Sequence, residues 1–296
     1  MPFRMHEILA EAEEKLKKAK IDEAKTDAWL LFEFIFQIDR AHYFLEMTEN
    51  IADKKHGTEL YEKYKEAVSM RSHHIPLQYI TGHQMFMGID FMVNHDVLIP
   101  RQDTEILAEK ALKACQSIFE RKKEVLHVLD MCTGSGCLAV SLKMLSKAPI
   151  NMTAVDLSKK ALKTAAENAK KNCCEIEFVN SDLFEKLGKR KFDIIVSNPP
   201  YIKSREIPLL MEEVRNYEPL MALDGEEDGL RFYREITGKS REYLKAAGVL
   251  FYEIGYEQAE DVIKILEKNG FENIQVFQDL AGLNRVIMAE YAAKET

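Results

Sequence analysis

Apolar side chains follow a helical period over the first part of the chain. Ala28, Leu31, Phe32 and Ile35 recur at spacings of three and four, which is the period of a helix with one buried face. Neighbouring aromatic side chains, Phe34 among them, widen this face, so we expect a nearly enclosed helix at the centre of a small bundle. The same period predicts further helices over residues 8–19, 40–47 and 60–68.

From residue 125 onward, short apolar runs alternate with amphipathic helical segments. Strands are predicted at residues 125–130, 152–156, 176–179, 192–196, 249–254, 273–277 and 285–289. Helices are predicted at residues 136–146, 158–172, 229–247 and 257–268, and residues 198–228 are predicted as a long loop. Because consecutive parallel strands are joined by right-handed crossovers, this alternation predicts a mostly parallel sheet covered by helices. The fold class is therefore α/β and Rossmann-like.

The segment between these two parts has the pattern of a β-hairpin. Two runs of aromatic and Met residues flank residues 88–90, as in two short paired strands. Beyond the hairpin, a helix reaching residue 119 is predicted, with Asp103 or Thr104 as its cap. We expect a helical domain at residues 1–75, a hairpin linker at 76–96 and an α/β domain at 97–296. The helical domain has no catalytic constellation, and packing and partner docking are equally good interpretations of it.

The strand predicted at residues 192–196 ends in Asn198, Pro199, Pro200 and Tyr201. Neither proline has a backbone N–H, so the sheet ladder stops there. A stiff loop with an amide and an aromatic ring should follow, at the carboxyl edge of the sheet where ligands bind in such folds. Taken alone, the four residues predict a plain proline-rich turn equally well.

Three other predicted strands deliver polar features to the same edge. The first leads into the loop Asp130-Met-Cys-Thr-Gly-Ser-Gly136, the second ends at Asp156 and the third at Asp182. Each acidic residue alone would fit a solvated loop. Together with Asn198–Tyr201, however, four strand ends bring polar features to one edge, which favours a nucleoside ligand. Asp156 is placed to accept hydrogen bonds from ribose hydroxyls. The loop is not a complete dinucleotide motif, because Cys132 stands at its first glycine position.

The loop lacks phosphate-binding features, which favours S-adenosylmethionine over a dinucleotide. S-adenosylmethionine has an amino-acid tail where a dinucleotide has a pyrophosphate. A substrate NH₂ group could then donate hydrogen bonds to the Asn198 side-chain oxygen and the Pro199 carbonyl, which would orient its nitrogen toward a methyl group. Tyr201 offers a face for a planar acceptor. A carboxylate acceptor would be repelled by these oxygens, so an amide is preferred over an acid.

Composition narrows the function classes. The formal net charge is −8, whereas proteins that neutralise nucleic-acid phosphates need basic surfaces, so no stable nucleic-acid partner is expected. No apolar run suits a membrane span and the N-terminus has no signal-peptide core. The five cysteines and eight histidines lack disulfide-framework or metal-ligand spacing. We therefore expect a cytoplasmic protein with no metal and no membrane association.

Several motifs combine with the strand ends. They are Gln78-Tyr79-Ile80-x-Gly82, Val97-Leu98-Ile99-Pro100-Arg101-x-Asp103-Thr104-Glu105, Asp130-x-Cys-Thr-Gly-Ser-Gly136, Ser197-Asn-Pro-Pro-Tyr-Ile202, Glu218-Pro-x-x-Ala222-Leu223, Asp228-Gly229-Leu230, Gly255-Tyr256 and Gly282-x-x-Arg285. Over nearly the whole chain this set resembles the PrmC/HemK protein-(glutamine-N5) methyltransferases, which modify peptide chain release factors. The segment Ile99–Glu105 is the most specific part. Cys132 and Gln102 depart from a commoner glycine and a commoner proline.

The resemblance implies a Rossmann-like class I S-adenosylmethionine-dependent methyltransferase with a small all-α N-terminal domain for substrate docking. It implies cofactor contacts from Cys132, Thr133, Gly134, Ser135, Gly136, Asp156, Asp182, Leu183 and Asn198. The acceptor glutamine, from the Gly-Gly-Gln motif of class 1 release factors, would be held by Asn198, Pro199, Pro200 and Tyr201, with Asn198, Pro199 and Tyr201 as the catalytic group and S-adenosylhomocysteine as product.

Three alternatives remain open. Glutamine-N5 methylation of a ribosomal protein would use identical site chemistry. Adenine-N6 methylation of nucleic acid shares the Asn-Pro-Pro-Tyr motif but fits poorly with the net charge of −8. A non-catalytic module that binds release factors would not need Asn198 and Tyr201.

Overall fold

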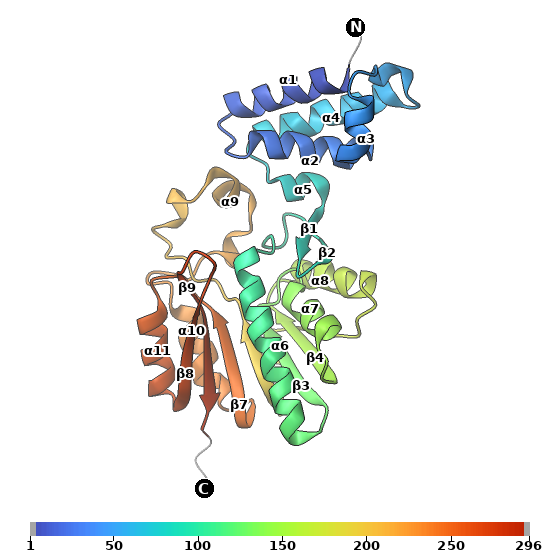
Figure 1. Cartoon of the computed structure of the whole chain (residues 1–296). Coiled ribbons are helices and arrows are strands. Elements are labelled where there is room, and N and C mark those ends of the chain that lie inside the picture. The colour runs from blue at the N-terminus through green and yellow to red at the C-terminus, as the bar shows by residue number, and fades with distance from the viewer. Residues whose placement is uncertain (1–3, 293–296) are drawn as a thin grey trace. The chain divides into compact units, whose positions relative to one another are not determined.

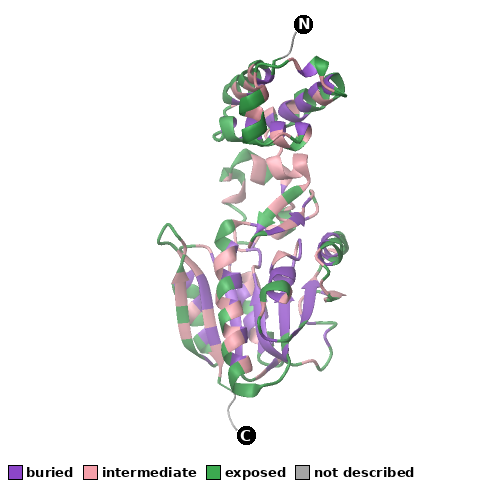
Figure 2. Ribbon diagram, turned by 45° about the vertical axis from the view of Figure 1, so that its right-hand side comes forward, coloured by how far each residue is buried: buried purple, intermediate pink, exposed green. Residues whose placement is uncertain are grey.

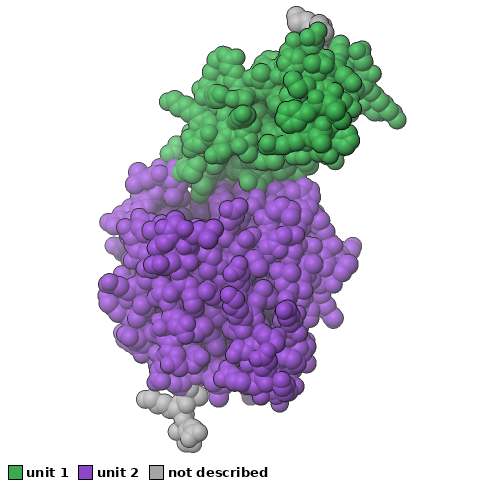
Figure 3. Space-filling view, in the orientation of Figure 1, with its two compact units in different colours: residues 1–82, 211–217 green, residues 83–210, 218–296 purple. Residues whose placement is uncertain are grey.

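The computed structural model describes residues 4–292 of the chain. The chain forms two compact units (Figure 3): unit 1 comprises Met1–Gly82 and Met211–Tyr217, and unit 2 comprises His83–Leu210 and Glu218–Thr296. Helix α5 (Leu77–Thr81) lies beyond the boundary expected at residue 75 and belongs to unit 1. The hairpin expected as a linker belongs to unit 2.

Unit 1 is a small bundle of helices around one apolar core (Figure 1). Its main helices are α1 (Met5–Lys18), α2 (Ala24–Phe36), α3 (Arg40–Glu46) and α4 (Gly57–Ser72). The predicted face of α2 is confirmed, because Leu31 and Phe32 are fully buried. The expectation that α2 is nearly enclosed is wrong, because Leu30 and Phe34 are 39% and 42% exposed. These two side chains are four residues apart and share the opposite face of the helix.

The segment predicted as a long loop contains a short helix, α9 (Glu212–Tyr217), which belongs to unit 1. Arg71 of α4 joins it to the bundle: its Nε donates to Asp27 Oδ2 at 2.6 Å, and its Nη2 lies 2.7 Å from Glu213 Oε2. The Tyr217 hydroxyl donates to the His73 carbonyl at 2.7 Å. Six residues are too few to show a helical period in the sequence, so long-range contacts define this element.

Unit 2 is built on a seven-stranded sheet with the order β5-β4-β3-β6-β7-β9-β8 (Figure 1). Its strands are β3 (Leu126–Met131), β4 (Ile150–Asp156), β5 (Glu177–Asn180), β6 (Phe192–Ser197), β7 (Leu244–Glu253), β8 (Phe271–Gln278) and β9 (Asn284–Tyr291). β9 pairs antiparallel with both β7 and β8, and the other neighbouring strands of this sheet pair in parallel. Each predicted strand and the α/β, Rossmann-like class are thereby confirmed.

Helices cover both faces of this sheet. On one face α6 (Gln102–Lys122), α7 (Cys137–Leu145) and α8 (Lys159–Lys171) enclose a core that contains Val128 and Ile194. On the other face α10 (Arg231–Ser240) and α11 (Ala259–Lys268) enclose a core that contains Leu129 and Ile195. Successive strand residues thus point to opposite faces. The residues of β6 are buried along the strand (Figure 2), as its apolar run predicts.

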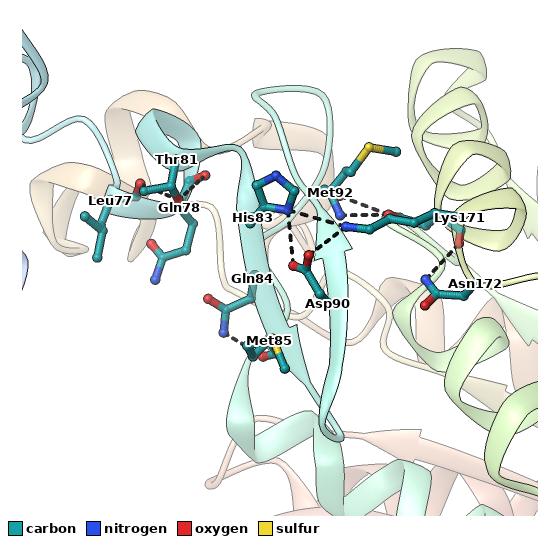
Figure 4. A network of polar contacts seen from close by, with 11 residues as sticks. Leu77, Gln78, Thr81, His83, Gln84, Met85, Asp90, Met92, Lys171 and Asn172 are labelled. Atoms are coloured by element: carbon teal, nitrogen blue, oxygen red, sulfur yellow. Dashed lines mark hydrogen bonds and ion pairs between the residues drawn. The ribbon is translucent and has the colours of Figure 1, made fainter. Parts of the chain in front are cut away.

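The predicted hairpin is confirmed as β1 (His83–Phe86) paired with β2 (Ile89–Met92). It is fastened to α8, as Figure 4 shows for Asp90: one of its oxygens accepts from Lys171 at 2.7 Å and the other lies 3.1 Å from His83 Nδ1. The buried Asn168 side chain accepts from the Met92 N–H at 2.7 Å and donates to the Met92 carbonyl at 3.0 Å. These contacts explain why the hairpin is part of unit 2.

Two predicted helix ends are wrong. The helix predicted at residues 229–247 ends at Ser240, because Leu244 instead pairs with Phe192 at the start of β7. Local preference for helix in the Ala-rich stretch thus yields to sheet pairing. Helix α6 begins at Gln102 with Arg101 at its N-cap, so neither Asp103 nor Thr104 caps it.

Candidate functional site

A pocket lies where β3 and β6 end. These strands are hydrogen-bonded neighbours, and the strand order continues from them in opposite directions, which is the point where α/β sheets bind ligands. The residues that line the pocket include Val97, Leu98, Pro100, Arg101, Thr104, Cys132, Thr133, Gly134, Ser135, Asp156, Asp182, Leu183, Asn198, Pro200, Met221 and Phe232. Four strand ends predicted from the sequence therefore meet in one pocket.

The glycine-rich loop between β3 and α7 has a fixed backbone. Gly136 has a φ of 79°, and a Cβ there would lie 3.0 Å from the Ala165 Cβ, so a side chain would push the loop from α8. A Cβ at Gly134 would meet no atom within 4 Å, and Gly134 is among the residues that line the pocket. Cys132 adopts a φ of 65° although it carries a side chain. The Thr133 N–H donates to the Val155 carbonyl at 2.9 Å and ties the loop to β4.

Asp130, near the end of β3, binds this loop through Thr133. It is fully buried, and its Oδ2 accepts from the Thr133 hydroxyl at 2.6 Å. Burial raises the pKa of Asp130 to about 7, although the Thr133 bond opposes this rise. The carboxyl group is not among the residues that line the pocket, so it acts on the loop rather than on a ligand directly.

Asp156 lies at the end of β4 with both oxygens engaged by backbone. Its Oδ2 accepts from the Gly134 N–H and its Oδ1 from the Ser158 N–H, each at 2.8 Å. Burial raises the pKa of Asp156, and these N–H groups act against the rise. A carboxylate has about four lone-pair sites, and Asp156 is among the residues that line the pocket. Asp182 and Leu183 line the same pocket beyond the end of β5.

The Asn-Pro-Pro-Tyr segment follows β6 as predicted. Asn198 and Pro200 line the pocket, whereas Pro199 and Tyr201 are not among its lining residues. The Asn198 Nδ2 donates to the Thr104 hydroxyl oxygen at 3.3 Å. The Tyr201 hydroxyl donates to Glu253 Oε1 at 3.2 Å, so its polar end faces the interior. Of the predicted cofactor residues, Gly136 also lies outside the lining, and it is the N-cap of α7.

Three polar residues of this site were not predicted as functional. Thr104 was assigned to a helix cap, but its hydroxyl meets Asn198. Glu218 accepts hydrogen bonds from the Arg101 guanidinium and, at 3.4 Å, from the Ile99 N–H. Glu253 is buried at the end of β7. The rule that singled out the other strand ends would have found Glu253 as well.

Within residues 4–292, no group of three or more His, Cys, Asp or Glu side chains could hold a metal ion. The described helices also include none with the length and apolar character to cross a membrane.

Comparisons with known proteins place this site in context. A model described as "PrmC N-terminal domain" matches residues 7–82, and one described as "Methyltransferase small domain" matches residues 108–214. A release factor glutamine methyltransferase from Clostridium acetobutylicum is 37% identical over 97% of this chain and 98% of its own. Another, from Fusobacterium nucleatum, is 38% identical over 97% of this chain and 79% of its own.

A solved structure has the same fold. A methyltransferase from Pyrococcus furiosus superimposes with a TM-score of 0.50, at 13% identity, over 70% of this chain and 91% of that one. At this identity the likeness concerns the fold alone.

Proposed function

Because the chain belongs to the family of release factor glutamine methyltransferases, we propose that it methylates the side-chain amide nitrogen of a glutamine in a class 1 peptide chain release factor. The methyl donor would be S-adenosylmethionine, the product S-adenosylhomocysteine, and the glutamine that of the Gly-Gly-Gln motif. One observation carries the proposal: Asn198 lies in the pocket with its nitrogen bonded to Thr104. Its oxygen remains to accept a hydrogen bond from a substrate NH₂ group.

The residues of the pocket fit S-adenosylmethionine. The open space beside Gly134 admits close approach of a ligand to the backbone. Asp156 lines the pocket, and a carboxylate has about four lone-pair sites, so it could accept from ribose hydroxyls in addition to the backbone N–H groups that it already binds. Leu183 supplies apolar surface for a base. When bound, the cofactor would supply a methyl group made electrophilic by its sulfonium sulfur.

The chain's own groups would orient the acceptor. An amide nitrogen is a weak nucleophile because its lone pair is delocalised. We infer that the Asn198 oxygen and the Pro199 carbonyl accept hydrogen bonds from the glutamine NH₂, which points its nitrogen at the methyl group and favours pyramidal geometry as the bond forms. A glutamate at the same place would be rejected, because its carboxylate oxygens would be repelled by the Asn198 side-chain oxygen and the Pro199 carbonyl. Tyr201 would provide a flat surface for the acceptor.

Transfer of a labelled methyl group tests the reaction. The purified protein, incubated with labelled cofactor, should label a class 1 release factor, and a release factor whose Gly-Gly-Gln glutamine is changed to glutamate should stay unlabelled. A ribosomal protein and a DNA duplex serve as competing acceptors. Equal labelling of the glutamate variant, or preferred labelling of either competitor, contradicts the proposal.

Asn198→Ala tests the assigned role of the amide. Turnover should fall by roughly 10²-fold or more, because the substrate nitrogen loses its orienting acceptor. Cofactor affinity, measured by calorimetry, should change little. Asn151→Ala is the matched control, since Asn151 is exposed on β4. If Asn198→Ala abolishes cofactor binding but leaves turnover per bound complex intact, the role is wrong.

A further inference from the structure

Glu253 is a buried carboxyl group at the reacting edge of the sheet. It ends β7 and is 2% exposed. Because Tyr252 pairs in parallel register with Ser197 of β6, Glu253 lies beside the first residue of the Asn-Pro-Pro-Tyr segment. A carboxyl group is costly to bury without polar partners, and an apolar side chain would serve packing better. The burial of a carboxyl group at this place therefore points to a polar task.

The contacts of Glu253 define that task. Its Oε1 accepts from the Tyr201 hydroxyl at 3.2 Å, whereas its buried Oε2 has no hydrogen-bond partner among the described residues and is left in need of a donor. Burial raises the pKa of Glu253, and interactions with the Thr104 hydroxyl, Arg285 and the Tyr201 hydroxyl oppose the rise. Each of these three neighbours presents a donor, so the carboxylate form is the one that they stabilise.

The orientation of the Asn198 amide depends on Thr104. An amide presents an acceptor on one side and a donor on the other, with nearly the same shape. A hydroxyl has one proton to donate. If Thr104 gives that proton to Glu253, it can only accept from Asn198, whose nitrogen then faces Thr104, in agreement with the 3.3 Å contact. The Asn198 oxygen must then face the pocket.

We propose that Glu253 is a positioning residue that, through Thr104, fixes which side of the Asn198 amide meets the acceptor. This inference rests on the proposed function, since it concerns the specificity of the same site. With the carboxylate in place, a substrate NH₂ group meets an oxygen. Without it, the Thr104 hydroxyl is free to donate to Asn198, and the amide can turn to present its own NH₂ group, which repels an amide acceptor.

Turnover and cofactor binding separate this role from a purely structural one. Glu253→Gln places a donor beside Thr104, and Thr104→Val removes the hydroxyl at constant shape. Each should lower single-turnover methyl transfer to a release factor by about tenfold or more, with the affinity for S-adenosylhomocysteine unchanged. Thr104→Ser keeps the hydroxyl and should lose less than about threefold. Glu257→Gln, on an exposed residue nearby, is the control.

The double variant tests whether the two residues act in one chain of hydrogen bonds. Glu253→Gln combined with Thr104→Val should be no slower than the worse single variant, within about twofold, since both break the same link. Multiplication of the two losses would mean independent effects and would overturn the proposal. So would full turnover in both single variants, or a loss that follows cofactor affinity.

A measurement that needs no release factor separates the positioning role of Glu253 from the proposed methyltransferase function. The side-chain NH₂ signals of Asn198, identified by their loss in Asn198→Asp, can be followed by nuclear magnetic resonance in protein bound to S-adenosylhomocysteine. Their hydrogen exchange should become at least about tenfold faster in Glu253→Gln and Thr104→Val, and not in Thr104→Ser. Unchanged signals overturn the positioning role. Absence of methyl transfer by the wild-type protein instead refutes the proposed function.

Discussion

Cys132 has a backbone conformation that side chains resist. Its φ of 65° lies in the left-handed region, which costs a residue with a Cβ roughly 1–2 kcal/mol. The neighbouring Thr133 N–H, bonded to β4, holds the loop in this shape. Burial, with Asp156 and Asp130 nearby, raises the pKa of the Cys132 thiol. The thiol therefore stays protonated at neutral pH and is a poor nucleophile, so its place in the loop implies no thiol chemistry.

Asp130 should make stability depend on pH. Burial raises its folded pKa to about 7, above the value of about 4 in an unfolded chain. Its contribution to the free energy of unfolding is therefore fully present below about pH 4 and is lost as the pH rises through about 7. Relative to Asp130→Asn, the wild-type protein should lose stability between pH 5 and pH 8 in urea unfolding followed by circular dichroism. Parallel profiles of the two proteins would contradict this expectation.

At the scale of elements, the end of α1 is a defined C-terminal motif with an unusual residue. The Ile21 N–H donates to the Leu16 carbonyl at 3.1 Å and the Lys20 N–H to the Lys17 carbonyl at 2.9 Å. Ile21 and Leu16 also share the apolar core of unit 1. This is the Schellman arrangement, in which glycine usually holds the left-handed position. Here Lys20 holds it, with a φ of 59°.

Replacing lysine by glycine should therefore have opposite effects within α1 and just after its C-terminal end. Lys20→Gly removes left-handed strain and should stabilise unit 1 by about 0.5–1 kcal/mol. Lys15→Gly, within the exposed side of the same helix, should destabilise it by about 1 kcal/mol. Trp29, the single tryptophan, lies in the core of unit 1, so its fluorescence during urea unfolding measures both. Destabilisation by both variants would refute the assignment of strain to Lys20.

The elements that were predicted from sequence are those with a local signal. The buried face of α2 and the apolar run of β6 follow from spacing alone. The start of β7 at Leu244 was missed because pairing with Phe192 overrides local preference for helix. Helix α9 was missed because its place depends on an arginine far away in sequence.

The candidate site was predictable to the same extent. Asp156, Asp182 and Asn198 were found because the ends of parallel strands meet at one edge, and all three line the pocket. Thr104 was missed because a threonine at the start of a helix looks the same in sequence whether its hydroxyl caps the helix or contacts another element, as it does with Asn198. Glu253 was missed although the same rule applies to it, because β7 is a further parallel strand whose carboxyl end meets this edge.

At the scale of the whole molecule, a buried ion group completes unit 1. Arg71 and Asp27 have side chains only 8% exposed, and Glu213 of α9 is 25% exposed. Burial raises the pKa of Asp27, and its bond to Arg71 acts in the opposite direction. The arginine is thus the group that makes a buried charged Asp27 tolerable.

Arg71→Met should destabilise unit 1 by about 3–5 kcal/mol, because it leaves a buried carboxylate without a partner. The Trp29 fluorescence transition in urea should shift accordingly. Arg121→Met, on an exposed residue of α6, should leave this transition unchanged. Asp27→Leu combined with Arg71→Met should recover most of the loss, since both members of the buried pair are then gone and the remaining Glu213 side chain is 25% exposed. A shift of less than about 1 kcal/mol in Arg71→Met would contradict this account.

The discontinuity of unit 1 has a consequence for how the protein is made. The ribosome releases the first 82 residues early, but α9 follows only after residue 211. Between the two lie four of the sheet strands, β3 to β6. The helical bundle therefore lacks α9, and Arg71 lacks its Glu213 partner, until residues 83–210 of the α/β unit have been synthesised. Completion of unit 1 therefore follows the synthesis of β3 to β6, although each unit has an apolar core of its own.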